Sequence, residues 1–282
     1  MKQILILLIA ALTVVGVEVR ADDVTSRHRP LWVVKPAKGK NRFTVVCDKE
    51  LPANLKRYDR MIFKPHIGAV NLVRGASRSS QGDYQATFSL VDAKKVAAMF
   101  RGYDDSEYAS IIVPHEFLDT HTPLQFTRWK GGEEVKTLTD EYFLNLLRIR
   151  YPEWRIASTQ WMATIGGDNE RQFYLVVFEP TPRQALASVV CFSEGRVVSS
   201  LDDMADISPD VERTSDGKPM HVWSVCDYGE YSMPEIMAFM DTDDGLEMYV
   251  RASGSECYVY RIYRESSGGW DLIDEMAVSD LE

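Results

Sequence analysis

Short runs of apolar, β-branched and aromatic residues make up most of the chain after Pro152. In residues 257–264 apolar and polar side chains alternate with a period of two, which is typical of a strand with one buried and one solvated face. Gly, Asp and Ser separate the apolar runs, so we predict a series of antiparallel strands. The predicted strands cover residues 154–165, 171–179, 185–193, 196–200, 220–226, 235–240, 246–252, 257–264 and 270–278.

The first half of the chain mixes helical and strand patterns. In residues 140–150, Phe143, Leu146 and Leu147 recur at helical spacing, and Pro152 is expected to end that helix. We therefore predict an α+β fold of mostly antiparallel β-sheet, with two or three helices in the N-terminal half. The other expected elements are helices at 93–101 and, shorter, at 53–61, and strands at 43–47 and 110–113.

The N-terminal residues have the pattern of a secretory signal peptide. Lys2 precedes an almost wholly apolar run from Ile4 to Val15, and Val19-Arg20-Ala21 is typical of a cleavage site. The alternative is an uncleaved membrane anchor, but this run is shorter than the roughly 20 residues that span a bilayer. We predict a signal peptide at 1–21 and export to the periplasm or the cell exterior, with no membrane span after cleavage.

Composition and charge restrict the function of the remaining chain. The 282 residues are 45% hydrophobic, which favours a folded protein over disorder. The 32 Lys and Arg against 42 Asp and Glu give a net charge of −10, which argues against a nucleic-acid binder. The predicted organisation is an α+β region at 22–200, an acidic connection at 201–218 and an antiparallel meander at 219–282.

Four cysteines would form disulfides in an oxidising compartment. Cys47, Cys191, Cys226 and Cys257 allow three connectivities, and no C-x-x-C pair suggests zinc or thioredoxin chemistry. We prefer a Cys226–Cys257 bridge, because these residues lie in two predicted strands of one region. The alternative is a set of buried free thiols, since cysteine also packs as a small apolar residue.

Residues 140–200 resemble PepSY-like domains of exported bacterial proteins. The resemblance rests on the helix followed by Tyr151-Pro152, on Trp161 in the next strand, and on the runs 173–178 and 189–195 that end in Gly195. It implies a small exported binding module, sometimes inhibitory toward an enzyme, rather than a catalyst. The chain departs from the family pattern in the insertion Pro180-Thr-Pro-Arg and in Cys191.

One cluster has the chemistry of metal ligands. Two imidazoles and two carboxylates occur within seven residues, at His115, Glu116, Asp119 and His121, and could hold zinc or another transition metal. Their spacing differs from the H-E-x-x-H of zinc proteases, so a hydrogen-bonded surface loop is the alternative. Residues 241–245 suggest calcium, but the twelfth position lacks the required Glu, and a hairpin turn explains them as well.

The aromatic residues Trp129, Tyr258 and Tyr260 are candidate contacts for a ligand or partner, with core packing as the alternative. The chain has no nucleophile elbow, phosphate loop or dinucleotide fingerprint, so we expect no cofactor. Whether the protein is an enzyme stays open, with the lack of motifs favouring a non-catalytic role.

Three functions remain open. The first is an exported, non-catalytic binding or inhibitory module that interacts through an antiparallel sheet face, with another exported protein or a cell-envelope component as its partner. The second is a secreted, metal-assisted hydrolase that uses residues 115–121. The third is a structural component of a cell-envelope assembly.

Overall fold

A computed structural model describes most of the chain between Arg29 and Ser279. The chain divides into Met1–Pro30 and the compact unit Leu31–Glu282. The predicted signal peptide and the predicted helix at 93–101 lie outside the described residues. The described residues are 29–37, 42–47, 50–63, 66–78, 82–92, 110–129, 133–166, 170–215, 217, 219–220, 222–223, 231, 234–253 and 257–279.

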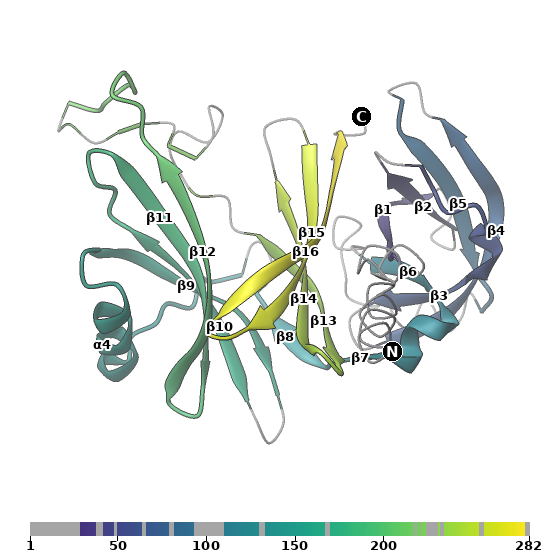
Figure 1. Ribbon diagram of the computed structural model, residues 1–282, viewed down its shortest axis with the longest axis horizontal. Helices are drawn as coiled ribbons and strands as arrows, with labels where there is room; N and C mark the ends of the chain where they lie inside the picture. Colours follow the sequence, from purple (N-terminus) through teal and green to yellow (C-terminus); the bar gives the residue numbers. More distant parts are fainter. Residues whose placement is uncertain are drawn as a thin grey trace, which may run out of the picture. The chain divides into compact units, whose positions relative to one another are not determined.

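The first six strands close into an antiparallel barrel in the order β1-β2-β5-β4-β3-β6 (Figure 1). Strand β5 shows the alternation of side chains that is expected of a strand with one face in the core: Ala86, Phe88 and Leu90 are buried, and the residues between them are half-buried. Pairing of β1 with β6 closes the ring, so no edge of this sheet is left without a neighbour. The strands are β1 (Leu31–Ala37), β2 (Arg42–Cys47), β3 (Tyr58–Phe63), β4 (His66–Arg78), β5 (Tyr84–Leu90) and β6 (Ser110–Pro114).

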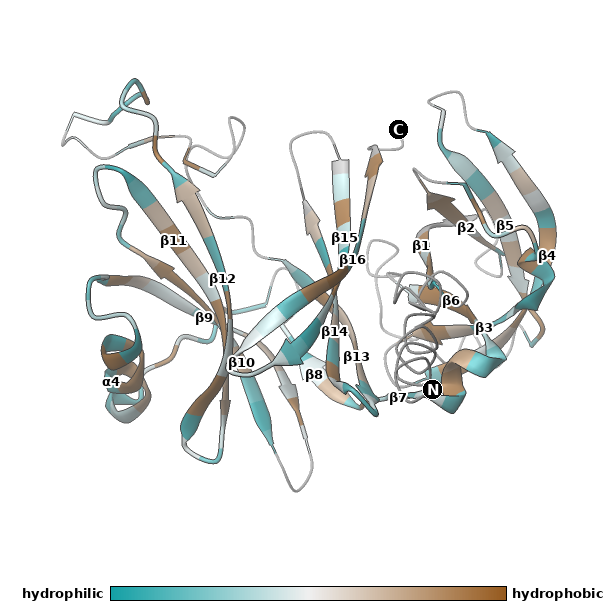
Figure 2. Ribbon diagram, viewed as in Figure 1, coloured by the Kyte–Doolittle hydropathy of each residue, from teal (hydrophilic) through white to brown (hydrophobic). Residues whose placement is uncertain are grey.

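A five-stranded antiparallel sheet, here the helix-covered sheet, has the order β12-β11-β10-β9-β8. Helix α4 (Glu141–Arg150) packs on one of its faces, through a cluster that includes Leu147, Val176 and Val190. Brown and teal segments alternate along α4 in Figure 2, as expected of an amphipathic helix. The strands are β8 (Phe126–Arg128), β9 (Ile156–Ile165), β10 (Arg171–Phe178), β11 (Gln184–Ser193) and β12 (Arg196–Asp206).

A second five-stranded antiparallel sheet, here the central sheet, has the order β16-β15-β14-β13-β7. The short strand β7 follows the 3-10 helix η3 (His115–Asp119) directly, so it connects the barrel to this sheet. Four consecutive hairpin strands make up the rest, as the apolar runs and turn residues after Pro152 predict. The strands are β7 (His121–Pro123), β13 (Glu235–Thr242), β14 (Gly245–Ser253), β15 (Cys257–Ser266) and β16 (Gly269–Ser279).

Apolar side chains cover both faces of the central sheet. On one face, Phe239 packs against Phe173 of the helix-covered sheet, with ring centroids 4.8 Å apart. On the other face, Tyr249 and Tyr260 pack against Trp32 of the barrel, at 5.8 and 5.0 Å. The buried layers therefore follow the order α4, helix-covered sheet, central sheet and barrel.

The predicted α+β class with two or three N-terminal helices is wrong, because the described residues are mainly strand and include a single α-helix. That helix confirms the prediction at 140–150: Asp140 caps it by accepting a hydrogen bond from the Tyr142 amide at 2.8 Å. The helix expected at 53–61 is instead the 3-10 turn η1 (Leu55–Arg57) followed by β3. Pairing of β3 with both β4 and β6 supplies its backbone hydrogen bonds, and this tertiary pairing outweighs local helical preference.

The predicted strands at 43–47, 110–113, 171–179, 185–193, 235–240, 246–252, 257–264 and 270–278 are confirmed, with ends that differ by a few residues. The strand predicted at 196–200 continues to Asp206, so the first part of the expected connection at 201–218 belongs to β12.

Candidate functional site

A buried carboxylate, Glu247, is the centre of a polar cluster among the described residues that includes the predicted site residue His121. It lies on β14 just after the hairpin turn from β13, and its side chain is only 3% exposed. Gly245 has φ +124°, which a glycine adopts without strain, and Thr242 donates a hydrogen bond to its carbonyl at 2.7 Å. The alternative interpretation of residues 241–245 as a hairpin turn is therefore confirmed.

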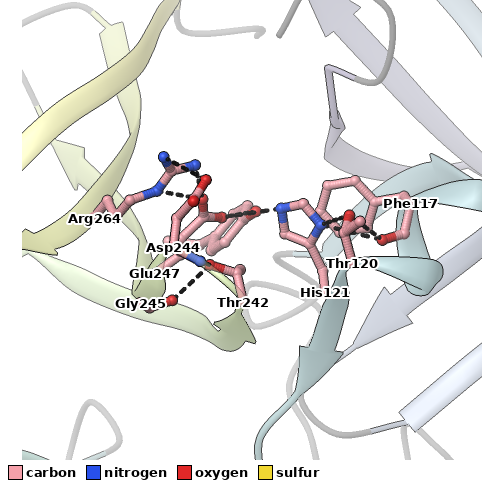
Figure 3. Close-up of polar contacts among 9 residues, drawn as sticks. Phe117, Thr120, His121, Thr242, Asp244, Gly245, Glu247 and Arg264 are labelled. Carbon is pink, nitrogen blue, oxygen red and sulfur yellow. Dashed lines mark hydrogen bonds and ion pairs between the residues drawn. The ribbon is translucent and has the colours of Figure 1, made fainter. Parts of the chain in front are cut away.

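Three side chains surround the Glu247 carboxylate (Figure 3). Arg264 of β15 donates from Nη2 and Nε to Oε1, at 2.8 and 3.2 Å. Tyr249 donates its hydroxyl to Oε2 at 2.8 Å, and His121 of β7 places Nε2 3.5 Å from the same oxygen. The two carboxylate oxygens therefore both have hydrogen-bonding partners, from three different strands.

The partners decide the ionisation of Glu247. Burial alone would raise the pKa of this carboxyl, but His121, Arg264 and Tyr249 stabilise its charged form and bring the pKa below the ordinary 4.5. The pKa of the Tyr249 hydroxyl is raised well above 10, first by burial and then by the charge of Glu247. Glu247 is thus a charged carboxylate at neutral pH, and Tyr249 a neutral donor to it.

His121 has partners on both ring nitrogens. Its Nδ1 lies 3.1 Å from the carbonyl oxygen of Phe117 and 2.8 Å from the hydroxyl of Thr120, opposite the side that faces Glu247. The ring also stacks on Phe117 with centroids 3.8 Å apart. A histidine that serves as a general base needs a nitrogen within reach of the substrate proton. Here both nitrogens are occupied by protein atoms, which favours a structural link between η3–β7 and β14.

The structure separates the predicted metal ligands. His115 lies at the opposite end of η3 from His121, with Nδ1 3.5 Å from carboxylate oxygens of both Asp59 and Glu116. A backbone hydrogen bond and then Arg57, 2.9 Å away, lower the pKa of Glu116. Asp119 is exposed at the end of η3. Across the described residues, no group of three or more His, Cys, Asp or Glu side chains could hold a metal ion.

The aromatic candidates lie in three different surroundings. Trp129 is half-buried and donates its indole N–H to the carbonyl of Glu133 at 3.3 Å. Tyr258 is half-buried beneath the guanidinium of Arg251, 5.1 Å from the ring centroid. Tyr260 is 1% exposed and belongs to the core beside Trp32, as the core-packing alternative had it. Trp129 and Tyr258 are therefore the two with partly accessible rings.

The expectation of disulfide bridges is wrong for the cysteine side chains that the structure describes. Cys47 and Cys191 belong to different apolar cores and do not bond to each other. Cys191 packs between the two sheets as a small apolar residue, and burial raises the pKa of its thiol to about 12. The preferred Cys226–Cys257 bridge lies outside the described side chains.

The barrel presents a polar surface on the outside of β2, β5 and β4, here called the polar barrel face. Residues that pair directly across antiparallel strands point to the same side, and the face follows from the register. Its first row is Arg42, Ser89 and Asn71. Its second row is Thr44, Thr87 and Arg74, and its third contains Gln85 and Ser77 beside the buried Val46.

Charge is divided unevenly along the sequence. Residues 31–114, which contain the barrel, include 14 Lys and Arg against 8 Asp and Glu. Residues 115–282, which contain both open sheets, include 14 against 31. The negative net charge of the whole chain therefore combines a basic region at 31–114 with a strongly acidic region at 115–282. Of these two regions, only the basic one can attract an anionic partner by its net charge.

Reasoning from the sequence missed Glu247, Tyr249 and Arg264 and the polar barrel face. Glu247 had a detectable signal, because it occupies the same alternating position as Tyr249 within an apolar strand. A charged residue at a position that should be buried indicates a buried ionic partner. Its partner His121 is 126 positions away, and no local pattern connects them.

In the described part of the chain, no helix is long and apolar enough to cross a membrane. Comparison with known protein families, with characterised proteins and with solved structures finds no match for this chain. The resemblance of residues 140–200 to PepSY-like domains therefore stays a prediction.

Proposed function

We propose that this protein is an exported, non-catalytic binding protein whose basic barrel engages an anionic component of the cell envelope. The observation that carries the proposal is the uneven charge, with 14 basic against 8 acidic residues in 31–114 and 14 against 31 in 115–282. A localised basic region attracts polyanions even when the whole protein is negative. The signal-peptide pattern at 1–21 supports export.

The cluster around Glu247 supports a non-catalytic role. Its carboxylate and both nitrogens of His121 are held by protein groups, so neither residue is poised to exchange a proton with a substrate. Such a network fits a rigid connection between barrel and central sheet. A rigid scaffold that presents a charged surface is a common design of binding proteins.

The layered packing indicates where an interaction through an antiparallel sheet face would take place. Apolar clusters pack against both faces of the central sheet, and α4 packs on the remaining face of the helix-covered sheet, although Leu272 and Ile273 of β16 and Met204 of β12 are exposed. The outer side of the barrel is also an antiparallel sheet face, and eight of the nine positions in its three rows are polar, although Ile67 and Val73 of β4 are also exposed. We therefore assign the interaction to the barrel.

The test is retention of Asp22–Glu282 on a cation-exchange resin at pH 7, where a protein with uniform negative charge would flow through. We expect retention that salt abolishes, because ions screen exposed charges. The variant Arg42→Glu/Arg74→Glu should flow through. The control Arg155→Glu/Arg196→Glu, which changes two exposed arginines outside the barrel by the same charge, should still be retained.

Three results would contradict the proposal. The first is flow-through of the unmodified chain, and the second is equal loss of retention in both variants. The third is turnover in a hydrolase screen that disappears in His121→Ala, because that would assign catalysis to the cluster around Glu247. Export is tested separately by mass spectrometry of the protein recovered outside the cytoplasm, which should begin at Asp22.

A further inference from the structure

The polar barrel face has an unusual composition for a sheet surface. Eight of its nine positions, in three rows across β2, β5 and β4, carry hydroxyl, amide or guanidinium groups. The opposite side of the same strands is apolar, with Phe43, Phe88 and Leu72 aligned in one row that faces the core. The face is thus mostly polar, with the buried Val46 in its third row, and is backed by a packed barrel interior.

Two arginines stand at diagonal positions of this face. Arg42 is exposed in the first row on β2, and Arg74 is exposed in the second row on β4. With β5 between them, strand spacing places their Cα atoms about 10 Å apart across the sheet and about 7 Å along it. Thr87, Ser89 and Asn71 occupy the positions of the same two rows beside the two arginines.

We infer that the polar barrel face binds an acidic polysaccharide, an inference that rests on the proposed function and names its partner. Guanidinium groups pair with carboxylates through two parallel hydrogen bonds, which suits uronic-acid residues. The hydroxyl and amide side chains beside them both donate and accept, which matches the hydroxyl groups of a sugar chain. A surface three strands wide is suited to an extended polymer.

The composition of the face argues against single-stranded nucleic acids as the partner. These polymers are held by aromatic side chains on which bases stack, and none of the nine positions is aromatic. Membrane surfaces are bound by basic residues together with apolar side chains that enter the lipid. Val46 of the three rows is buried, but Ile67 and Val73 of β4 are 38% and 47% exposed, so the comparison with vesicles decides between a membrane and a polysaccharide. Charge combined with hydroxyl groups favours the polysaccharide.

The test measures binding of Asp22–Glu282 to immobilised polygalacturonate by surface plasmon resonance. Dextran, vesicles containing phosphatidylglycerol and a thymidine oligonucleotide serve as comparison probes. We expect polygalacturonate to bind most tightly and dextran not to bind. The variant Arg42→Gln/Arg74→Gln should weaken polygalacturonate binding on the order of tenfold or more.

A matched control distinguishes binding through the polar barrel face from binding through positive charge in general. Arg155 and Arg196 are 84% and 70% exposed, and Arg155→Gln/Arg196→Gln removes the same charge from outside the barrel. This control should bind polygalacturonate as the unmodified chain does. A second variant, Thr87→Val, keeps both arginines and tests whether the hydroxyl groups contribute, with an expected loss of a few fold.

Three outcomes would overturn the inference: tighter binding to vesicles or to the oligonucleotide, no binding to polygalacturonate, or equal weakening by the two arginine pairs. If the chain is retained on the cation exchanger through Arg42 and Arg74 but does not bind polygalacturonate, the proposed function is kept. The inference that the partner is an acidic polysaccharide is then refuted. If retention is also absent, both fail.

Discussion

Replacing Glu247 with glutamine tests whether the cluster around it holds the barrel to the central sheet. The substitution keeps the size of the side chain and removes the charge that Arg264 and His121 face at 2.8 and 3.5 Å. Removing one partner of a buried ion pair costs about 3–5 kcal/mol, because the other charge is left uncompensated. Arg264 is 31% exposed and still contacts Asp244 at 3.2 Å, which lowers that cost. We therefore expect a loss of about 2–3 kcal/mol in the free energy of unfolding.

The pH dependence of this loss identifies its electrostatic origin. The pKa of Glu247 in the folded protein lies below 4.5, so its charge stabilises the fold fully above pH 4.5. That contribution is lost as pH falls through the lower folded pKa. Glutamine does not titrate, so the difference in stability between the unmodified chain and Glu247→Gln should shrink as the pH is lowered toward 3.

Urea unfolding followed by tryptophan fluorescence measures both effects at pH 7 and at lower pH. The control is Glu179→Gln, which removes an exposed carboxylate 3.6 Å from Arg155 and should change stability by less than about 0.5 kcal/mol. The reasoning is refuted if Glu247→Gln equals the control, or if its deficit at pH 7 persists unchanged at low pH.

Three further predictions concern the sheets. Tyr151→Phe removes a hydroxyl that donates to Asp202 at 2.7 Å, and urea unfolding should show a loss of about 1–2 kcal/mol. Cys191 has a pKa of about 12, so a thiol reagent at pH 8 should leave it unmodified until the protein is unfolded, as peptide mass spectrometry would show. Phe173→Ala opens a cavity against Phe239 between the two sheets, and calorimetry should show a lower Tm, equivalent to about 3–5 kcal/mol.

Strand positions in the second half were predictable because runs of apolar, β-branched and aromatic residues are separated there by turn residues. Both features are properties of the sequence, so β13 to β16 could be located within a few residues. Barrel strands carry a weaker signal. Strand β4 contains Gly68 and Gly75 and two register shifts, which interrupt the alternation that sequence reasoning depends on.

The candidate site was predictable only in part. His121 stood out as a possible ligand, but its carboxylate partner is Glu247 of a distant hairpin rather than Glu116 beside it in the sequence. The reason is the pairing of β7 with β13, which brings residue 121 opposite Thr242. Such pairing depends on the tertiary fold, and local spacing carries no information about it.

The fold itself explains why the barrel is the part left to interact. Strands β13 and β14 are apolar on both sides, and each side is buried by another layer, whereas β16 exposes Leu272 and Ile273. The apolar side chains of the helix-covered sheet are buried in the same way, against α4 on one face and against the central sheet on the other. A closed barrel, by contrast, buries apolar side chains inside itself and is free to place polar side chains outside. Arg42 and Arg74 occupy such outer positions, where they are not needed for packing. Their replacement should therefore change binding while leaving the free energy of unfolding within about 0.5 kcal/mol.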